Sequence, residues 1–379
     1  MNRRNAGFSL IEMLIVIAIF GFVLAGTSQM FVSTLTTHRQ QSKIAETNVE
    51  GIIGLEMLRK DLWKAGYGLP WNGLTAYSEA VANPYLLNDS TTTQPPRAIA
   101  GANDVVAGPA LIGTDYLAIK AVNVAVNNAS GKWTFLSSSP TVTTTSWVPA
   151  SEDLSSTDRV IVLSPGTLTS SAARNLVTPL TARFSDVTSY ADTSSNNETR
   201  IVYGIDSNAA LTTLRMPFNR ADYYVKRPTS GMSQRCAGGT GNLYKASVNQ
   251  SDGQMTDMPL LDCVADLQIV FRLDRNNDGN LTSTNVLTDL LGVALTASQI
   301  QSQVKEVRVY VLAQEGQKDL NYAYAFPAIA PCPANQIYVG GDSTVGNSLG
   351  RCFTFSGITD WQNYRWKLYT LVVTLDNLT

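Results

Sequence analysis

The amino-acid sequence predicts an α+β protein in which one long amino-terminal helix packs against an antiparallel, β-rich head domain. No proline occurs between Met1 and Leu69, so nothing in that stretch forces a helix to break. The segment from Met13 to Leu35 contains no charged residue. Beyond Pro70, apolar segments rich in β-branched residues alternate with stretches rich in Ser, Thr, Asn and Pro, which is typical of strands and surface loops.

The charge-free run is long enough to cross a membrane. Its 23 residues would extend about 35 Å as a helix, slightly more than the hydrocarbon core of a bilayer. Arg3 and Arg4 precede the run, so the positive-inside rule predicts a cytoplasmic amino terminus and a head on the far side. Glu12 places a carboxylate at the start of the run, where it costs about 3 kcal/mol in lipid without a partner and is therefore a candidate functional residue. We assign residues 8–35 to a transmembrane helix.

The helix is predicted to continue outside the membrane as an amphipathic segment, residues 36–67. Apolar residues recur mostly at spacings of three and four, which predicts one buried stripe, made of Ile44, Ile52, Leu55, Leu58 and Leu62. Charged residues between them predict a solvent-exposed face, made of Glu46, Glu50, Glu56, Arg59, Lys60 and Asp61. The glycines at 21, 26, 51 and 54 are candidate bends, and residues 66–70 are expected to end the helix.

Six segments of the head, residues 68–379, are predicted strands. Three are long and β-branched and should pair antiparallel on the second half of the helix, namely Val264–Leu273, Val304–Ala313 and Arg365–Leu375. Three shorter ones are 116–122, 159–163 and 200–203. The low-complexity stretches at 88–96, 137–156 and 188–199 are predicted surface loops rich in Ser and Thr.

Composition argues against nucleic-acid binding and against catalysis. The chain of 379 residues has 44% hydrophobic but only 15% charged residues, with a net charge of −2. It can therefore form a large core but lacks the cationic surface that is the main source of affinity for nucleic acid. His38, the only histidine, lies just past the apolar run, which leaves no Ser–His or Cys–His pair and no H-E-x-x-H zinc site. We expect no enzyme activity and no catalytic residue.

The four cysteines, Cys236, Cys263, Cys332 and Cys352, predict disulfides. No two of them have the C-x-x-C spacing of a zinc or thioredoxin-like site. Beyond the cytoplasmic membrane an oxidising environment favours their oxidation. Of the three pairings, we expect Cys236–Cys263 and Cys332–Cys352, because both close short loops.

The segment from Asp274 to Thr282 is a candidate calcium loop. It follows the pattern D-x-[DN]-x-[DN]-G, with the candidate ligands Asp274, Asn276, Asp278, Asn280 and Thr282. Asn285 stands at position twelve, where an EF-hand has a bidentate Glu, and a predicted strand rather than a helix precedes the loop. The alternative is a plain Asn-Asp-Gly turn, for which these residues also suffice.

The amino-terminal region resembles a prepilin signal. A basic leader, residues 1–7, ends in Gly7, and Glu12 follows four residues after Phe8 at the start of the apolar helix. This arrangement is similar to that of type IV pilins and type II secretion pseudopilins. The resemblance implies that a membrane peptidase cuts after Gly7, that Phe8 becomes an N-methylated amino terminus, and that Glu12 acts in assembly. A secretory signal peptide and a plain anchor are the alternatives, and neither explains Gly7-Phe8 together with Glu12.

Later segments resemble the PilW-type minor pilins. They are residues 58–68, 221–225, 243–244, 264–268, 304–309 and 375–378. The resemblance implies a minor pilin that acts in assembly or initiation of the type IV pilus, and the large head suggests a place at the filament tip. The expected partners are other minor pilins, the major pilin, the prepilin peptidase and the inner-membrane pilus platform. The chain would cross the inner membrane once before assembly and lie in the extracellular pilus afterwards.

Two other functions remain open from the sequence. A J-type pseudopilin of type II secretion shares the helix and the β-rich head. A membrane-anchored adhesin exported by the pilin route would use residues 71–199, which carry no resemblance, as its binding part. The tryptophans at 71, 133, 147, 361 and 366 are scattered, which is more typical of core residues than of a ligand surface.

Overall fold

The structure, a computed structural model, describes most of the chain beyond the first eight residues. The described residues are 9–81, 87–89, 94–106, 110–166, 174–288, 290–326, 332–341 and 349–378. Gly7 and Phe8, the expected processing site, lie outside the described residues.

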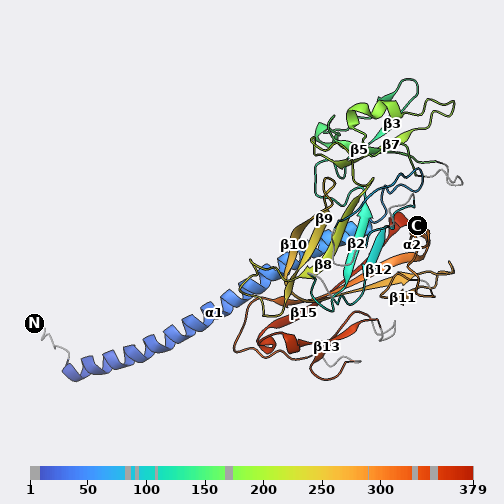
Figure 1. Ribbon diagram of the computed structural model, residues 1–379. Coiled ribbons are helices and arrows are strands. Elements are labelled where there is room, and N and C mark those ends of the chain that lie inside the picture. The colour runs from blue at the N-terminus through green and yellow to red at the C-terminus, as the bar shows by residue number, and fades with distance from the viewer. Residues whose placement is uncertain are drawn as a thin grey trace, which may run out of the picture.

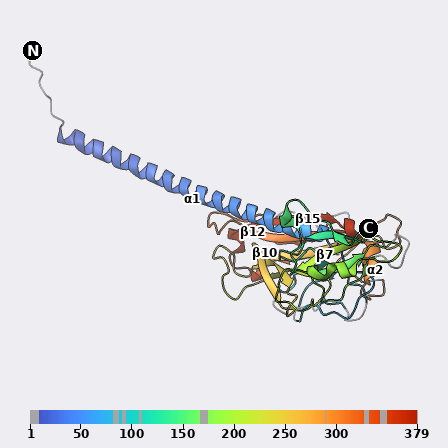
Figure 2. The same cartoon turned by 90° about the horizontal axis from the view of Figure 1, so that it is seen from above.

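One helix, α1 (Leu10–Trp63), contains 54 residues and is about 80 Å long at 1.5 Å per residue. Figure 1 and Figure 2 show its first half standing free of the head and its second half lying against the head. The chain then turns away through Gly66 and Gly68, whose φ angles are +83° and +65°. Because glycine adopts these angles without a Cβ clash, the chain turns where the sequence predicts, although α1 itself ends at Trp63 rather than at residue 67.

The head is built on an eight-stranded antiparallel sheet with the order β1-β2-β8-β9-β10-β12-β15, in which β11 pairs with β10. Its strands are β1 (Ile99–Ala102), β2 (Tyr116–Ala121), β8 (Asn219–Lys226), β9 (Gly241–Val248), β10 (Met255–Leu273), β11 (Thr282–Thr284), β12 (Val304–Glu315) and β15 (Arg365–Thr374). The strands β10, β12 and β15 are adjacent, pair antiparallel and contact α1. This confirms the packing predicted for the three long β-branched segments.

A second, five-stranded sheet with the order β4-β3-β7-β5-β6 and a hairpin of β13 and β14 complete the head. These strands are β3 (Trp133–Ser137), β4 (Thr143–Thr144), β5 (Arg159–Ser164), β6 (Asn175–Leu176), β7 (Arg200–Asp206), β13 (Gln336–Val339) and β14 (Arg351–Thr354). The short helices are α2 (Ala297–Gln303), η1 (Ala150–Glu152), η2 (Phe184–Tyr190), η3 (Phe355–Gly357), η4 (Trp361–Asn363) and η5 (Asp376–Leu378). In Figure 1 the second sheet and β13 lie on opposite sides of the main sheet, so the head is broad across the direction of α1.

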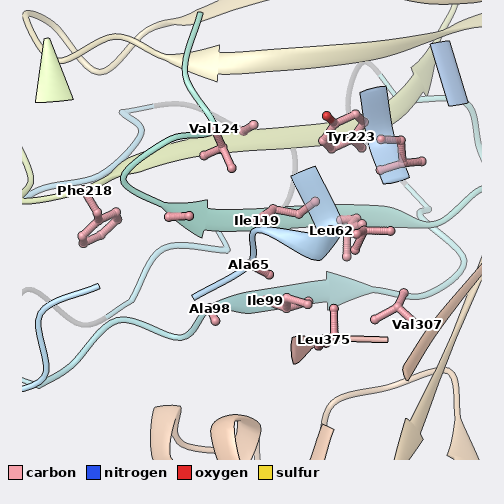
Figure 3. Close-up of a cluster of buried hydrophobic side chains, with 14 of the residues drawn as sticks. Leu62, Ala65, Ala98, Ile99, Ile119, Val124, Phe218, Tyr223, Val307 and Leu375 are labelled. Carbon is pink, nitrogen blue, oxygen red and sulfur yellow. The ribbon is translucent and has the colours of Figure 1, made fainter. Parts of the chain in front are cut away.

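The main hydrophobic core lies between α1 and the main sheet. Side chains alternate along a strand, and in β2 the residues Leu117 and Ile119 point to the helix and are fully buried. They share one cluster with Leu58 and Leu62 of α1, and Figure 3 shows Leu62 close to Ile119. Because burying one leucine side chain contributes about 2 kcal/mol, these contacts hold the second half of α1 on the sheet.

The buried stripe of α1 lies at a different position around the helix from the one that the sequence predicts. Leu55, Leu58 and Leu62 are buried, and Ile44 is half-buried, but Ile52 is 65% exposed. The expectation for Ile52 was wrong because, at 3.6 residues per turn, it lies about 90° around the helix from the mean direction of the three leucines. Thr47, Gly51, Gly54 and Asp61 are buried beside the leucines instead, so the contact with the sheet is shifted around the helix, away from Ile52.

Two glycines are sites of close approach rather than the bends that the sequence suggested. A Cβ at Gly54 would stand 2.3 Å from the carbonyl oxygen of Leu260, and a Cβ at Gly51 would stand 3.1 Å from the hydroxyl oxygen of Tyr369. Both glycines lie within the unbroken span of α1. The missing side chains therefore let the helix backbone come near β10 and β15.

Asp61 is buried, although the sequence placed it on the solvent-exposed face. Asp61 is only 3% exposed. Its carboxylate accepts a hydrogen bond of 2.7 Å from the Tyr223 hydroxyl and forms an ion pair with Lys245. These partners lie on β8 and β9, far away in sequence, so the pattern of α1 alone does not indicate them. The compensated charge fixes this turn of α1 on the sheet.

The face of β2 and β8 that points away from α1 carries a buried network of charged groups. The Lys120 ammonium lies 2.7 Å from Glu79 and 2.5 Å from Asp89. The Arg220 guanidinium lies 2.8 Å from Glu79 and makes two bonds of 2.7 and 2.8 Å to Asp222. Lys120 and Arg220 are both 0% exposed. Each buried charge therefore has a partner of opposite sign, as burial requires.

Asp115, directly before β2, is a buried carboxyl whose proton is held tightly. It is 2% exposed, and its two oxygens accept hydrogen bonds from the backbone N–H groups of Asp104 (2.9 Å) and Ile269 (2.6 Å). Burial outweighs these hydrogen bonds and raises the pKa of Asp115 to about 7. In the unfolded chain the pKa returns to about 4.

We therefore expect the head to lose stability as the pH rises. The stabilisation from protonated Asp115 is fully present below about pH 4 and is lost as the pH rises through about 7. The free energy of unfolding of the detergent-solubilised chain, from urea titrations between about pH 5 and pH 8, should fall by at most about 1.4 kcal/mol per unit. Asp115→Asn does not titrate and should give a flatter curve. If the unfolding free energy changed equally with pH in the unsubstituted chain and in Asp115→Asn, groups other than Asp115 would cause the pH dependence.

Candidate functional site

The amino-terminal end of α1 is closed by a capping box. Ser9 is the N-cap residue, and its hydroxyl oxygen accepts a hydrogen bond of 3.2 Å from the backbone N–H of Glu12. The Glu12 carboxylate in return accepts hydrogen bonds from the backbone N–H (2.9 Å) and the hydroxyl (3.0 Å) of Ser9. Glu12 thus has a partner in its own chain. The S-x-x-E spacing of Ser9 and Glu12 signals this box, and our sequence analysis missed it.

The first half of α1 presents a continuous apolar surface. Every large apolar side chain between Leu10 and Leu35 is at least 41% exposed. An 18-residue window of this helix has a mean hydropathy of 2.4 with none of it buried in the protein. A bare apolar helix of this length is long enough to span a bilayer and is unfavourable in water. Contact with lipid or with other apolar helices would therefore be needed to bury this surface.

The apolar surface continues on the outer side of α1, where the helix already lies against the head. Val49 is 56% exposed, Ile52 is 65% exposed and Ile53 is 61% exposed, and Trp63 near the end of the helix is 52% exposed. The head covers only the opposite side of the helix, at the leucine row. An adjacent helix that ran beside α1 would bury these side chains together with the free half.

The helix is also linked to the head by charges. Arg235 forms an ion pair with Glu50 of α1 and lies 3.5 Å from Asp262 of β10. The next residue, Cys236, is covalently bound to Cys263 of β10. The disulfide therefore fixes the position of the Arg235 guanidinium relative to β10. Its ion pair with Glu50 then resists separation of α1 from the sheet.

Both disulfides that the sequence favoured are formed in the structure. Cys236 is bonded to Cys263, and Cys332 is bonded to Cys352 of β14. The loops they close are short, with sequence separations of 27 and 20 residues. His38 lies exposed on α1, and the four cysteines are all in these two disulfides.

The candidate calcium loop folds as a turn that satisfies its own polar groups. Asp274 accepts hydrogen bonds from the backbone N–H groups of Asp278 (3.1 Å) and Gly279 (3.0 Å). Asp278 accepts from the Asn276 side chain (2.8 Å) and the Asn280 backbone (2.7 Å). The Thr282 hydroxyl donates to the Leu273 carbonyl at 3.1 Å. In the part of the chain that the structure describes, no group of three or more His, Cys, Asp or Glu side chains has the geometry of a metal site.

Calcium binding by this loop stays a prediction. With no carboxylate at position twelve, the dissociation constant should be on the order of 10⁻⁴ M. About 10 mM calcium should then stabilise the folded chain by up to about 2.7 kcal/mol relative to EDTA, visible as a higher melting temperature. Asp274→Ala with Asp278→Ala should abolish the difference. Identical melting of the unsubstituted chain in calcium and in EDTA would reduce the loop to a turn.

Comparison with known proteins places the two ends of this architecture in described families. Residues 2–28 match the family model described as the prokaryotic N-terminal methylation motif. Residues 222–377 match the model described as type IV pilus-assembly protein W. No curated protein sequence matches the chain.

Among solved structures, the chain is similar to a type IV-like pilin from Thermus thermophilus. The sequence identity is 13%, the match covers 44% of this chain and 70% of the other, and the TM-score is 0.23. The assignment therefore rests on the family models and not on this superposition. The matched residues comprise the start of α1, with Gly7, Phe8 and Glu12, and the strands on which its second half packs. The chain thus combines a prepilin-type amino terminus with a domain of the type IV pilus-assembly protein W family over residues 222–377.

Proposed function

We propose that the chain is a minor pilin that acts in assembly and initiation of the type IV pilus, at the tip of the filament. The methylation motif is common to both classes, and the match to pilus-assembly protein W supports this function over that of a J-type pseudopilin. The observation that carries it is the bare apolar half of α1, which has no partner in the described part of the head.

The proposal assigns two successive environments to this helix. Before assembly, residues 8–35 cross the inner membrane, with the amino terminus in the cytoplasm, where the prepilin peptidase removes residues 1–7. The pilus platform then transfers the helix from lipid into a bundle with helices of other minor pilins and the major pilin. The exposed side chains at Val49, Ile52 and Ile53 extend the surface that such a bundle would bury.

The shape of the head supports a tip position. The second sheet and the β13–β14 hairpin widen the head on opposite sides of the main sheet in Figure 1. Heads of this breadth would crowd one another if repeated along a helical shaft, whereas a terminal subunit has free space. Antibody against the head, detected by gold labelling in electron micrographs, should mark filament ends. Labelling along the shaft would reject the tip position. If the antibody labelled secretion pseudopili but not pili, the assignment of the chain to the type IV pilus would be rejected.

Glu12 offers a test of assembly that separates charge from helix capping. Glu12→Gln retains the capping box, because glutamine also serves at its third helical position, but removes the charge. Ser9→Ala removes the capping hydroxyl and retains the carboxylate. If Glu12 pairs with the amino terminus of a neighbouring subunit, Glu12→Gln and Glu12→Ala should both lower the amount of this chain in sheared pili, by about tenfold for a loss of 1.4 kcal/mol.

The membrane level of the precursor is the control for this experiment, because insertion depends on the apolar helix and should stay unchanged in all variants. Ser9→Ala should assemble better than Glu12→Gln if the charge matters. Normal incorporation of Glu12→Gln would leave Glu12 with the capping role alone.

A further inference from the structure

A cavity of about 300 Å³ lies where the end of α1 meets the second sheet. Its walls come from both parts of the head, with Tyr67 following α1 and Leu163, Ile201 and Tyr203 on β5 and β7. Arg174, directly before β6, also lines it. The assembly function does not use this cavity, which lies at the opposite end of α1 from Glu12.

Arg174 brings an uncompensated positive charge to the cavity. Its side chain is half-buried, and within the described parts of the chain no carboxylate lies within ion-pair distance of it. The one hydrogen bond of its side chain in those parts is a long contact of 3.4 Å from Nη1 to the carbonyl oxygen of Gly66. Burial lowers the pKa of Arg174, yet a guanidinium stays protonated in proteins. Among the described residues, four of its five N–H donors thus have no partner and are left for water or for an anion.

Aromatic side chains extend from the cavity over the same face of the second sheet. Tyr67 and Tyr203 meet edge to face at 5.5 Å. Across β3 and β7, Phe135 is paired with Ile201 and Trp133 with Tyr203, and paired residues of adjacent strands share a face. Phe135 is 37% exposed.

Trp147 completes this aromatic strip, which we define as Trp133, Phe135 and Trp147. The Trp147 ring lies 4.9 Å from the Trp133 ring, and its indole N–H donates to the Trp133 carbonyl at 2.6 Å. Trp133 and Trp147 are half-buried, so each offers part of a ring to solvent. Two of the tryptophans that the sequence described as scattered are therefore adjacent, next to the cavity.

We propose that the Arg174 cavity and the aromatic strip bind a saccharide that carries a carboxylate. A single planar guanidinium matches one carboxylate in bidentate geometry, whereas a phosphate dianion would require further cations. The tyrosine hydroxyls suit sugar hydroxyl groups, and the exposed ring faces suit the apolar C–H faces of further sugar units. The site would give a pilus subunit an affinity for acidic polysaccharide surfaces, independently of its role in assembly.

The experiment compares an oligomer of galacturonic acid with the same oligomer after reduction of its carboxyl groups. Binding to the detergent-solubilised full chain is measured by saturation-transfer NMR and by tryptophan fluorescence. We expect the acidic oligomer to bind, the reduced oligomer to bind at least about tenfold more weakly, and salt to weaken only the former. Arg174→Gln should abolish the preference, and Arg174→Lys, which retains charge but not the fork, should restore part of it.

Two further variants locate the saccharide. Phe135→Ala should weaken binding of long oligomers more than of the monosaccharide, because only the longer ones reach the aromatic strip. Arg59→Gln, which alters an exposed arginine of α1, is the matched control and should bind normally. Each variant is first shown by its melting curve to be folded. The proposal is overturned by equal binding of the acidic and reduced oligomers, by unchanged binding to Arg174→Gln, by no binding to the unsubstituted chain, or by a carboxylated peptide that takes the site in preference to the saccharide.

Discussion

Replacing Gly7 by valine is expected to leave the entire chain as uncut precursor in the inner membrane. The family resemblance implies that the peptidase requires a residue without a side chain before the cut. In the described residues, Ser9 is an extended N-cap residue and α1 begins at Leu10. A branched Cβ at position 7 would then block the peptidase directly.

Mass spectrometry of the purified chain measures this outcome without further assumptions. The unsubstituted chain should begin with methylated Phe8, and Gly7→Val should retain all of residues 1–7. Gly21→Val is the matched control, because a Cβ at Gly21 meets nothing within 4 Å and lies far from the cut. It should mature normally. Cleavage of Gly7→Val at the normal site would remove the prepilin assignment of the leader.

Local signals account for the parts of the fold that the sequence predicted. A charge-free run without proline can hardly form anything other than a helix that meets lipid or other helices, and α1 is that helix. The three long β-branched segments were found because each crosses the sheet and combines bulk with alternation. The turn after Trp63 was found because Gly66 and Gly68 supply backbone angles that few other residues tolerate.

The errors on α1 have a different physical origin. Asp61 is buried because Tyr223 and Lys245 neutralise it, and these partners lie more than 160 residues away in the chain. Gly54 resembles a helix defect until Leu260 is seen next to it. Such contacts between distant segments leave no periodic trace in a single sequence, so an amphipathic pattern assigns the charged residue to solvent and the glycine to a bend.

The sites divide in the same way. The Ser9–Glu12 box is local and could have been recognised from its spacing. The Arg174 cavity could not, because it joins the end of α1 to strands of a sheet that the sequence did not predict as a unit. The strands β8 and β9 were missed for a related reason, since Arg220, Asp222 and Lys245 make them look solvated while the fold buries these charges.

Replacing Arg220 by methionine is expected to destabilise the head by about 3–5 kcal/mol, a large part of the stability of an ordinary domain. Burial alone would lower the pKa of Arg220, but Asp222 and Glu79 raise it above its ordinary value, so the group is charged in the fold. Methionine fills similar space but leaves the Asp222 carboxylate, among the described residues, with only the Tyr116 hydroxyl, at 2.7 Å. The cost is that of an unpaired buried charge, not of lost packing.

Urea unfolding of the detergent-solubilised chain, followed by circular dichroism of the β-rich head, measures this loss. Arg59→Met is the matched control, because its ion pair with Glu56 (3.2 Å) is exposed on α1 and should change stability by no more than about 0.5 kcal/mol. Adding Asp222→Leu to Arg220→Met removes the orphaned carboxylate and should recover part of the stability, which a loss of packing would not permit. If Arg220→Met were no more destabilising than Arg59→Met, the charges on β2 and β8 would have to be hydrated in solution, and the buried network would not hold the head together.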